Sequence, residues 1–240
     1  ERDLRAPERV AIDYGDAAEL ADRAARALNA LSDDKPAAWR ALRGRGIYRG
    51  QGVPGKVAFL YTGQGSQYVN MLRDLRAAEP IVAEVFDEAD RIMTPLLGGR
   101  ALSSYIFVDD SDATAVAAAE EALRHTEITQ PAVLTVDAAL TRLLGAYGIG
   151  PDLVMGHSLG EYGALVAAGS LEFSAALEAV SARGREMANL EVDDPGTLAA
   201  VSAPLAEVER ILAGIDGYVV VANVNSTRQL VLGGATAAVA

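Results

Sequence analysis

A serine flanked by two glycines has the clearest chemical potential in this chain. The segment Gly156-His157-Ser158-Leu159-Gly160 follows a short apolar run and precedes a helical pattern. In that context G-x-S-x-G predicts a nucleophile elbow, a tight turn that exposes the serine hydroxyl. The helix N-terminus and the Leu159 backbone N–H would then stabilise the negative charge formed when Ser158 attacks a carbonyl. A glycine-rich turn with an incidental serine is the competing interpretation.

A second glycine-rich loop, Gly63-Gln64-Gly65-Ser66-Gln67, follows the apolar run Val57–Tyr61. It lacks the lysine of a P-loop and the third glycine of a dinucleotide fingerprint, so phosphate binding is a poor match. Alternatively, the Gln64 N–H could turn toward the elbow and complete an oxyanion hole. A plain tight turn also fits this loop on its own.

Arg183 lies on a helix predicted at about 175–189 and shares its face with apolar residues. A guanidinium on such a face needs an anionic partner if it is buried. A structural ion pair or a side chain that extends to solvent is the ordinary interpretation. A substrate carboxylate, held by two parallel hydrogen bonds, is the functional one.

The chain has two histidines, His125 and His157, and neither is a good base for Ser158. Adjacent elbow residues project in different directions, which argues against His157. His125 precedes the serine, whereas the base follows it in the α/β-hydrolase chain order. Either the serine is not activated by histidine, or the base lies beyond Ala240.

Composition narrows the class of protein. The 240 residues carry a net charge of −12, which argues against nucleic acid or an anionic membrane as partner. The absence of cysteine excludes disulfides and thiolate metal sites, and we expect no metal. No apolar stretch reaches the roughly 18 residues that span a bilayer, and Glu1–Arg5 does not resemble a signal peptide. We expect a cytoplasmic protein, and the first residue, which is not Met, suggests a piece of a longer chain.

Three regions are predicted along the chain. Residues 1–55 form a small α+β unit, with a strand at 10–14, a helix at 17–31, a short helix around Trp39 and a glycine-rich, looped exit. The basic run Arg40–Lys56 contains no acid. It is either a solvated face or a surface that docks an acidic partner.

Residues 56–194 are predicted to form a parallel-sheet core, since apolar strands alternate with helices. The continuous apolar run at 57–61 suggests a strand buried on both faces, and the short run at 153–155 suggests a second buried strand. Further helices are expected at 81–93, 114–124, 159–168 and 175–189, and another opens at Gln130-Pro131. Residues 195–240 read β-α-β-β-α, one strand short of a ferredoxin-like unit, so we expect this subdomain to be incomplete.

Taken together, these motifs resemble the acyltransferase domain of polyketide and fatty acid synthases, the malonyl-CoA:acyl-carrier-protein transacylase family. The resemblance spans residues 57–240 and follows the family's motif order. It rests on Tyr61-Thr62-Gly63-Gln64-Gly65-Ser66-Gln67, Thr129-Gln130-Pro131-Ala132, Gly156-His157-Ser158-Leu159-Gly160-Glu161-Tyr162, Ala182-Arg183-Gly184 and Asn223-Val224-Asn225-Ser226. Residues 1–55 are similar to the linker that joins a ketosynthase to its acyltransferase. Some longer runs resemble iterative polyunsaturated fatty acid and enediyne synthases.

The resemblance implies an α/β-hydrolase-like core with an inserted ferredoxin-like subdomain, and it implies a role for each motif. Ser158 would be the acyl-accepting nucleophile, with Gln64 and Leu159 supplying the oxyanion hole. Arg183 would hold the malonyl carboxylate. The other residues assigned to substrate binding are Gln130, His157, Asn223 and Asn225. The family's base is a histidine past the position of Ala240.

The implied reaction carries a malonyl group from malonyl-CoA through Ser158 to the 4′-phosphopantetheine thiol of an acyl carrier protein. No bound cofactor is expected, and an adjacent ketosynthase domain is an expected partner. Leu159 after the serine favours malonyl over methylmalonyl only weakly. A serine esterase or thioesterase on the same elbow and a non-catalytic carrier-protein docking module are the alternatives.

Overall fold

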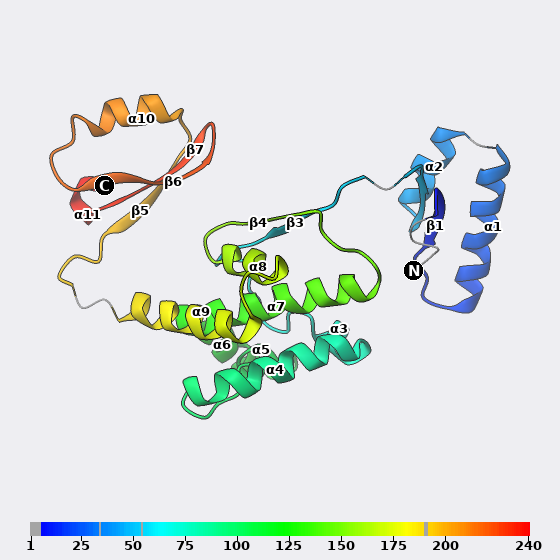
Figure 1. The fold of residues 1–240 in the computed structure, drawn as a ribbon, viewed down its shortest axis with the longest axis horizontal. Helices are drawn as coiled ribbons and strands as arrows, with labels where there is room; N and C mark the ends of the chain where they lie inside the picture. The colour runs from blue at the N-terminus through cyan, green and yellow to red at the C-terminus, as the bar shows by residue number, and fades with distance from the viewer. Residues whose placement is uncertain (1–5, 34, 54, 190–191) are drawn as a thin grey trace. The chain divides into compact units, whose positions relative to one another are not determined.

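The computed structural model describes residues 6–33, 35–53, 55–189 and 192–240. By its internal contacts the chain divides into two compact units, Glu1–Gly184 and Arg185–Ala240 (Figure 1). Each unit is built from both helices and strands.

The N-terminal part of the first unit consists of two paired strands and the two helices that connect them. Strand β1 (Glu8–Ile12) pairs antiparallel with β2 (Ile47–Gln51), and α1 (Ala17–Asp33) and α2 (Pro36–Arg43) lie between them in the chain. Their apolar faces meet in a small core of Ala27, Ala30, Trp39 and Ile47. The prediction of a looped exit was wrong over β2. One glycine inside this five-residue strand and one on either side of it removed the apolar alternation that would have revealed it.

Helices form the core of residues 56–184, as their 3.6-residue periodicity predicts. The longest are α4 (Pro80–Leu96), α7 (Thr126–Ala146) and α9 (Phe173–Ala188). Shorter helices are α3 (Arg73–Ala78), α5 (Ser103–Ile106), α6 (Ala113–Ala122) and α8 (Gly160–Ala167). Phe86 of α4, Leu134 of α7 and Leu177 of α9 are fully buried within one apolar cluster.

Helix α7 begins at Thr126, so the prediction that Gln130-Pro131 opens it was wrong. Pro131 lies inside the helix, where it cannot donate the hydrogen bond that the Glu127 carbonyl would accept. The unbroken burial of residues 128–135 outweighs that cost by packing. The Thr126 hydroxyl also donates to the Gly184 carbonyl oxygen at 2.8 Å, which ties the first turn of α7 to α9.

Strands β3 (Ala58–Tyr61) and β4 (Leu153–Gly156) confirm the predicted parallel pairing, with Ala58 opposite Leu153 and Tyr61 opposite Gly156. Figure 1 shows α8 packed against both strands. The prediction that both faces are buried was wrong. Leu60 is 71% exposed, Leu153 57% and Met155 58%, because α8 covers the opposite face.

The second unit has the predicted β-α-β-β-α order. It contains β5 (Thr197–Val201), α10 (Leu205–Leu212), β6 (Val219–Ser226), β7 (Gln229–Gly234) and α11 (Thr236–Val239). The sheet is antiparallel, with β7 between β5 and β6. Across the described parts of both units, no helix is long and apolar enough to cross a membrane.

Candidate active site

Ser158 occupies a strained turn between β4 and α8. Its φ of 53° lies in the left-handed region, which non-glycine residues adopt rarely and mostly at functional positions. The serine is exposed, whereas Leu159 is 1% exposed and anchors the start of α8. The backbone therefore presents the hydroxyl as the nucleophile-elbow prediction requires.

The two flanking glycines permit a close approach of backbone segments. A Cβ at Gly160 would clash with the Tyr61 carbonyl oxygen, and one at Gly156 would clash with the Gly160 backbone. Any larger residue would push α8 away from β3 or open the turn itself. The glycines thus fix how the elbow meets the end of β3.

The loop after β3 lies against this elbow. The His157 N–H donates to the Tyr61 carbonyl oxygen at 3.2 Å. A Cβ placed on Gly63 would lie 3.0 Å from the His157 carbonyl oxygen and 3.9 Å from the Ser158 Cβ. Because β3 and β4 are parallel, their carboxyl ends bring the two predicted glycine-rich motifs together.

Hydrogen bonds within the loop hold its conformation. The Gly65 N–H donates to Gln67 Oε1 at 2.8 Å, and the Ser66 hydroxyl donates to the Gly63 carbonyl oxygen at 3.0 Å. Gln67 Nε2 also donates to the Leu123 carbonyl oxygen at 3.1 Å, which ties the loop to the segment before α7. The position of Gln64 is therefore set by its neighbours on both sides.

Three predicted site residues form a hydrogen-bonded series. Gln130 is fully buried on α7, and its Nε2 donates to Gln64 Oε1 at 3.5 Å. Arg183 Nη1 on α9 donates to Gln130 Oε1 at 2.9 Å. A loop, α7 and α9 each contribute one member, and the Gln64 end lies in the loop that touches the elbow.

Arg183 is a half-buried cation. Among the described residues no carboxylate pairs with it, and Gln130 is a neutral partner. The guanidinium carries five N–H donors in a planar fork that matches a carboxylate. A partly desolvated cation of this kind favours an anionic ligand.

Close packing sets the position of Arg183. A Cβ on the next residue, Gly184, would lie 2.7 Å from the Glu127 Cα, so α9 approaches the first turn of α7 without a side chain between them. Gln130 lies one turn further along α7. This glycine therefore allows the arginine to reach the buried amide.

The other predicted residues lie beside Ser158, at the start of α7 or in the second unit. His157 is exposed beside Ser158, and His125 is exposed at the N-cap of α7. Asn223 and Asn225 lie on β6 of the second unit, and their place along the acyl path stays a prediction. The described residues contain no cluster of three metal-ligating side chains.

Asp137 is a polar residue close to the site that the sequence reasoning missed. Its Oδ2 is buried without a hydrogen-bond partner among the described residues, and burial raises the pKa of the carboxyl to about 7. A Cβ on Gly163 of α8 would lie 2.8 Å from that oxygen. Tyr61 packs against the same glycine and shares a 2.8 Å hydrogen bond with the Thr141 hydroxyl. A carboxylate inside an otherwise apolar helix face was the available signal.

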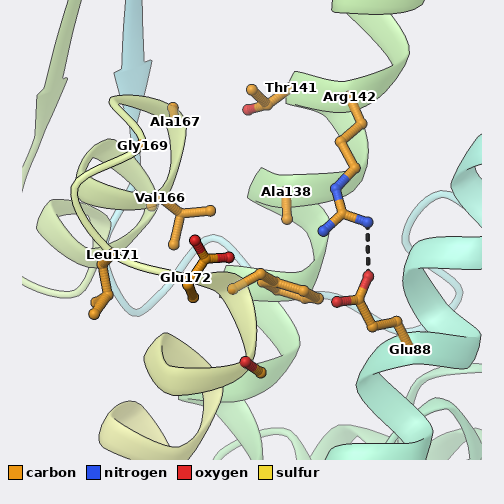
Figure 2. Close-up of a pocket in the computed structure, with 12 residues that line it drawn as sticks. Glu88, Ala138, Thr141, Arg142, Val166, Ala167, Gly169, Leu171 and Glu172 are labelled. Atoms are coloured by element: carbon orange, nitrogen blue, oxygen red, sulfur yellow. Dashed lines mark hydrogen bonds and ion pairs between the residues drawn. The ribbon is translucent and has the colours of Figure 1, made fainter.

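A separate cavity of about 280 Å³ lies among α7, α8 and the start of α9. Figure 2 shows Arg142 reaching toward Glu88 of α4 across its rim, with an Nη1–Oε2 distance of 2.7 Å. The Arg142 guanidinium also lies 5.2 Å from the Phe173 ring centroid. None of the predicted site residues lines this cavity.

Comparison with known proteins gives one consistent result. A family model described as an acyl transferase domain matches residues 58–240. The chain is 37% identical over 88% of its length to the spectinabilin polyketide synthase system protein NorB of Streptomyces orinoci. It is also 37% identical over 75% of its length to the malonyl CoA-acyl carrier protein transacylase of Bacillus subtilis.

A solved structure, the acyltransferase domain from the second module of the salinomycin polyketide synthase, covers 97% of the chain with a TM-score of 0.74 and 35% identity. These matches confirm the predicted fold class, an α/β-hydrolase-like core with a small ferredoxin-like subdomain. The chain spans 49% of the salinomycin domain, 53% of the Bacillus transacylase and 9% of NorB.

Proposed function

Since this chain belongs to the acyl transferase domain family, we propose that it transfers a malonyl group from CoA to an acyl carrier protein. The observation that carries the proposal is the series Gln64–Gln130–Arg183, which runs from the loop at the elbow to a half-buried cation. We assign residues 1–55 to a linker unit, 56–194 to the acyltransferase core and 195–240 to the small subdomain. A ketosynthase in the same polypeptide is the proposed neighbour of the linker.

In the first proposed step the Ser158 hydroxyl oxygen attacks the thioester carbonyl carbon of malonyl-CoA. The carbonyl oxygen becomes an oxyanion, which the backbone N–H groups of Gln64 and Leu159 stabilise. Collapse of the tetrahedral intermediate breaks the carbon–sulfur bond, and CoA leaves as the thiol after taking up the proton lost by the serine. The product is a malonyl ester on Ser158.

In the second step the phosphopantetheine thiol of the carrier protein attacks that ester. The same donors stabilise the second oxyanion, and the serine leaves with a proton as the malonyl thioester forms. Neither His125 nor His157 is proposed as the base. No bound cofactor is required by either step.

Arg183 is proposed to hold the free carboxylate of the malonyl group, with Gln130 orienting its guanidinium. This contact would favour extender units over neutral acyl groups, because an acetyl group leaves the cation without its anion. His157, Asn223 and Asn225 are proposed to line the acyl and pantetheine path.

Intact-protein mass spectrometry after incubation of the full-length protein with malonyl-CoA tests this function. A malonyl adduct on Ser158 is expected, with loss of that adduct in Ser158→Ala and transfer of the group to an added holo carrier protein. An adduct that persists in Ser158→Ala would overturn the assignment. Rapid hydrolysis of a neutral p-nitrophenyl ester with no stable acyl-enzyme would favour an esterase.

A further inference from the structure

A polar cavity of about 350 Å³ lies in the N-terminal part of the first unit, and none of the residues assigned to acyl transfer lines it. It is formed by α2 and β2. The residues that line it are Pro36, Trp39, Arg40, Arg43, Arg49 and Gln51. Among these described residues there is no carboxylate, although the whole chain has a net charge of −12.

Two of the three arginines have no counter-ion. Arg40 and Arg43 are three residues apart on α2, so their side chains emerge on the same side of the helix. Both are exposed, and within the described part of the chain neither pairs with a carboxylate. Their charges are therefore available to a ligand.

The third arginine is held in place. Arg49 Nε lies 3.1 Å from Glu8 Oε2, and its guanidinium carbon lies 5.3 Å from the centroid of the Trp39 ring. Gln51 Nε2 donates to the other oxygen of Glu8 at 3.4 Å. These contacts fix one wall of the cavity and offset one positive charge, which leaves Arg40 and Arg43 as the excess.

Trp39 also lines the cavity. The residue is 8% exposed, and its indole Nε1 is buried without an acceptor among the described residues. Buried donors without partners are rare in native proteins because they lose their water and gain nothing in return. Charge stabilisation at the end of α2 accounts for two basic residues on this helix. It does not account for the three arginines, Arg40, Arg43 and Arg49, that line one cavity with no carboxylate among its described lining residues.

We propose that this cavity binds a phosphate dianion, either free phosphate or the phosphate monoester of a small molecule. The phosphate oxygens can accept from the paired N–H groups of Arg40 and Arg43, which both line the cavity. Arginine suits this role because its planar fork donates two parallel hydrogen bonds to phosphate. The inference does not depend on the chemistry of Ser158.

Trp39 is the single tryptophan of the chain, so its fluorescence reports on this cavity directly. Inorganic phosphate is titrated into the full-length protein, with sodium chloride of equal ionic strength as the reference. The expected result is a saturable change in emission with phosphate and none with chloride. A change that fails to saturate, or that chloride reproduces, would overturn the proposal.

Two double variants distinguish specific phosphate binding in the cavity from non-specific electrostatic attraction. Arg40→Gln/Arg43→Gln removes the unpaired cations of the cavity, and phosphate affinity should fall at least about tenfold. Arg45→Gln/Lys56→Gln removes the same charge from residues that do not line it, and affinity should stay within about twofold. Equal losses in both would reduce the effect to non-specific attraction and contradict the inference.

The source of the phosphate is resolved by comparing CoA with 3′-dephospho-CoA in the same fluorescence assay. Tighter binding of CoA, lost in Arg40→Gln/Arg43→Gln, would identify a monoester such as the CoA 3′-phosphate. Saturation by inorganic phosphate with no preference between the two CoA forms would identify free phosphate. Saturation by neither phosphate nor CoA would reject the site.

Discussion

Replacing Asp137 by Asn tests the environment beneath the elbow helix. The substitution keeps the shape of the side chain and removes its ability to ionise. Asp137 is partly buried beside Gly163 of α8, and burial raises the pKa of its carboxyl from 3.8 to about 7. Ionisation therefore takes place far more readily in the unfolded chain than in the folded one.

The sign and size of the effect follow from this pKa difference. The folded state binds the proton more tightly, so the contribution of Asp137 to stability is complete below pH 4. It is lost progressively as the pH rises toward 7. At about 1.4 kcal/mol per pKa unit, the loss reaches on the order of 4 kcal/mol above pH 7. Asp137→Asn should not lose this stability, because the amide side chain does not ionise.

Urea unfolding between pH 4 and pH 8, followed by far-ultraviolet circular dichroism, measures this difference. Asp137→Asn should match the native protein near pH 4 and exceed it by roughly 3–4 kcal/mol at pH 8. Asp74→Asn, on a fully exposed side chain, is the matched control and should shift stability by less than about 0.5 kcal/mol. A difference between Asp137→Asn and the native protein that does not change with pH would contradict a raised pKa of the Asp137 carboxyl.

Two other variants test the packing that positions the site. Gly160→Ala should abolish acylation of Ser158 and lower the free energy of unfolding by about 2 kcal/mol or more, because the new Cβ clashes with the Tyr61 carbonyl oxygen. Near-native acylation and stability in this variant would contradict the prediction. Gln130→Leu should raise the KM for malonyl-CoA by about tenfold and leave the KM for acetyl-CoA nearly unchanged, because the substitution removes the acceptor of the Arg183 hydrogen bond. Steady-state kinetics with both donors measure this difference. Equal changes in the two KM values would assign Gln130 to the fold alone.

The sequence contained the elbow in full because its chemistry is local. Two glycines, a serine, a preceding strand and a following helix are adjacent in the chain, and the positive φ of Ser158 follows from that turn. The parallel pairing of β3 and β4 was also predictable, since it follows from the alternation of strands and helices.

Features that depend on distant residues were harder to predict. The hydrogen bonds among Gln64, Gln130 and Arg183 join positions far apart in sequence, and no periodicity encodes them. The exposed faces of Leu60 and Met155 depend on what packs over β3 and β4, which an apolar run does not specify. Helix α7 extended past a proline that ordinarily marks a helix start, because burial outweighed the missing hydrogen bond.

The proposed carboxylate site at Arg183 is tested most directly by the rate at which Ser158 is acylated by malonyl-CoA and by acetyl-CoA in Arg183→Ala. We predict that malonyl transfer falls by on the order of a hundredfold, the worth of a charge-assisted contact. Acetyl transfer should fall far less, so the preference for malonyl is lost. Equal losses for the two donors would assign Arg183 to the structure of α9 and contradict the proposed carboxylate site.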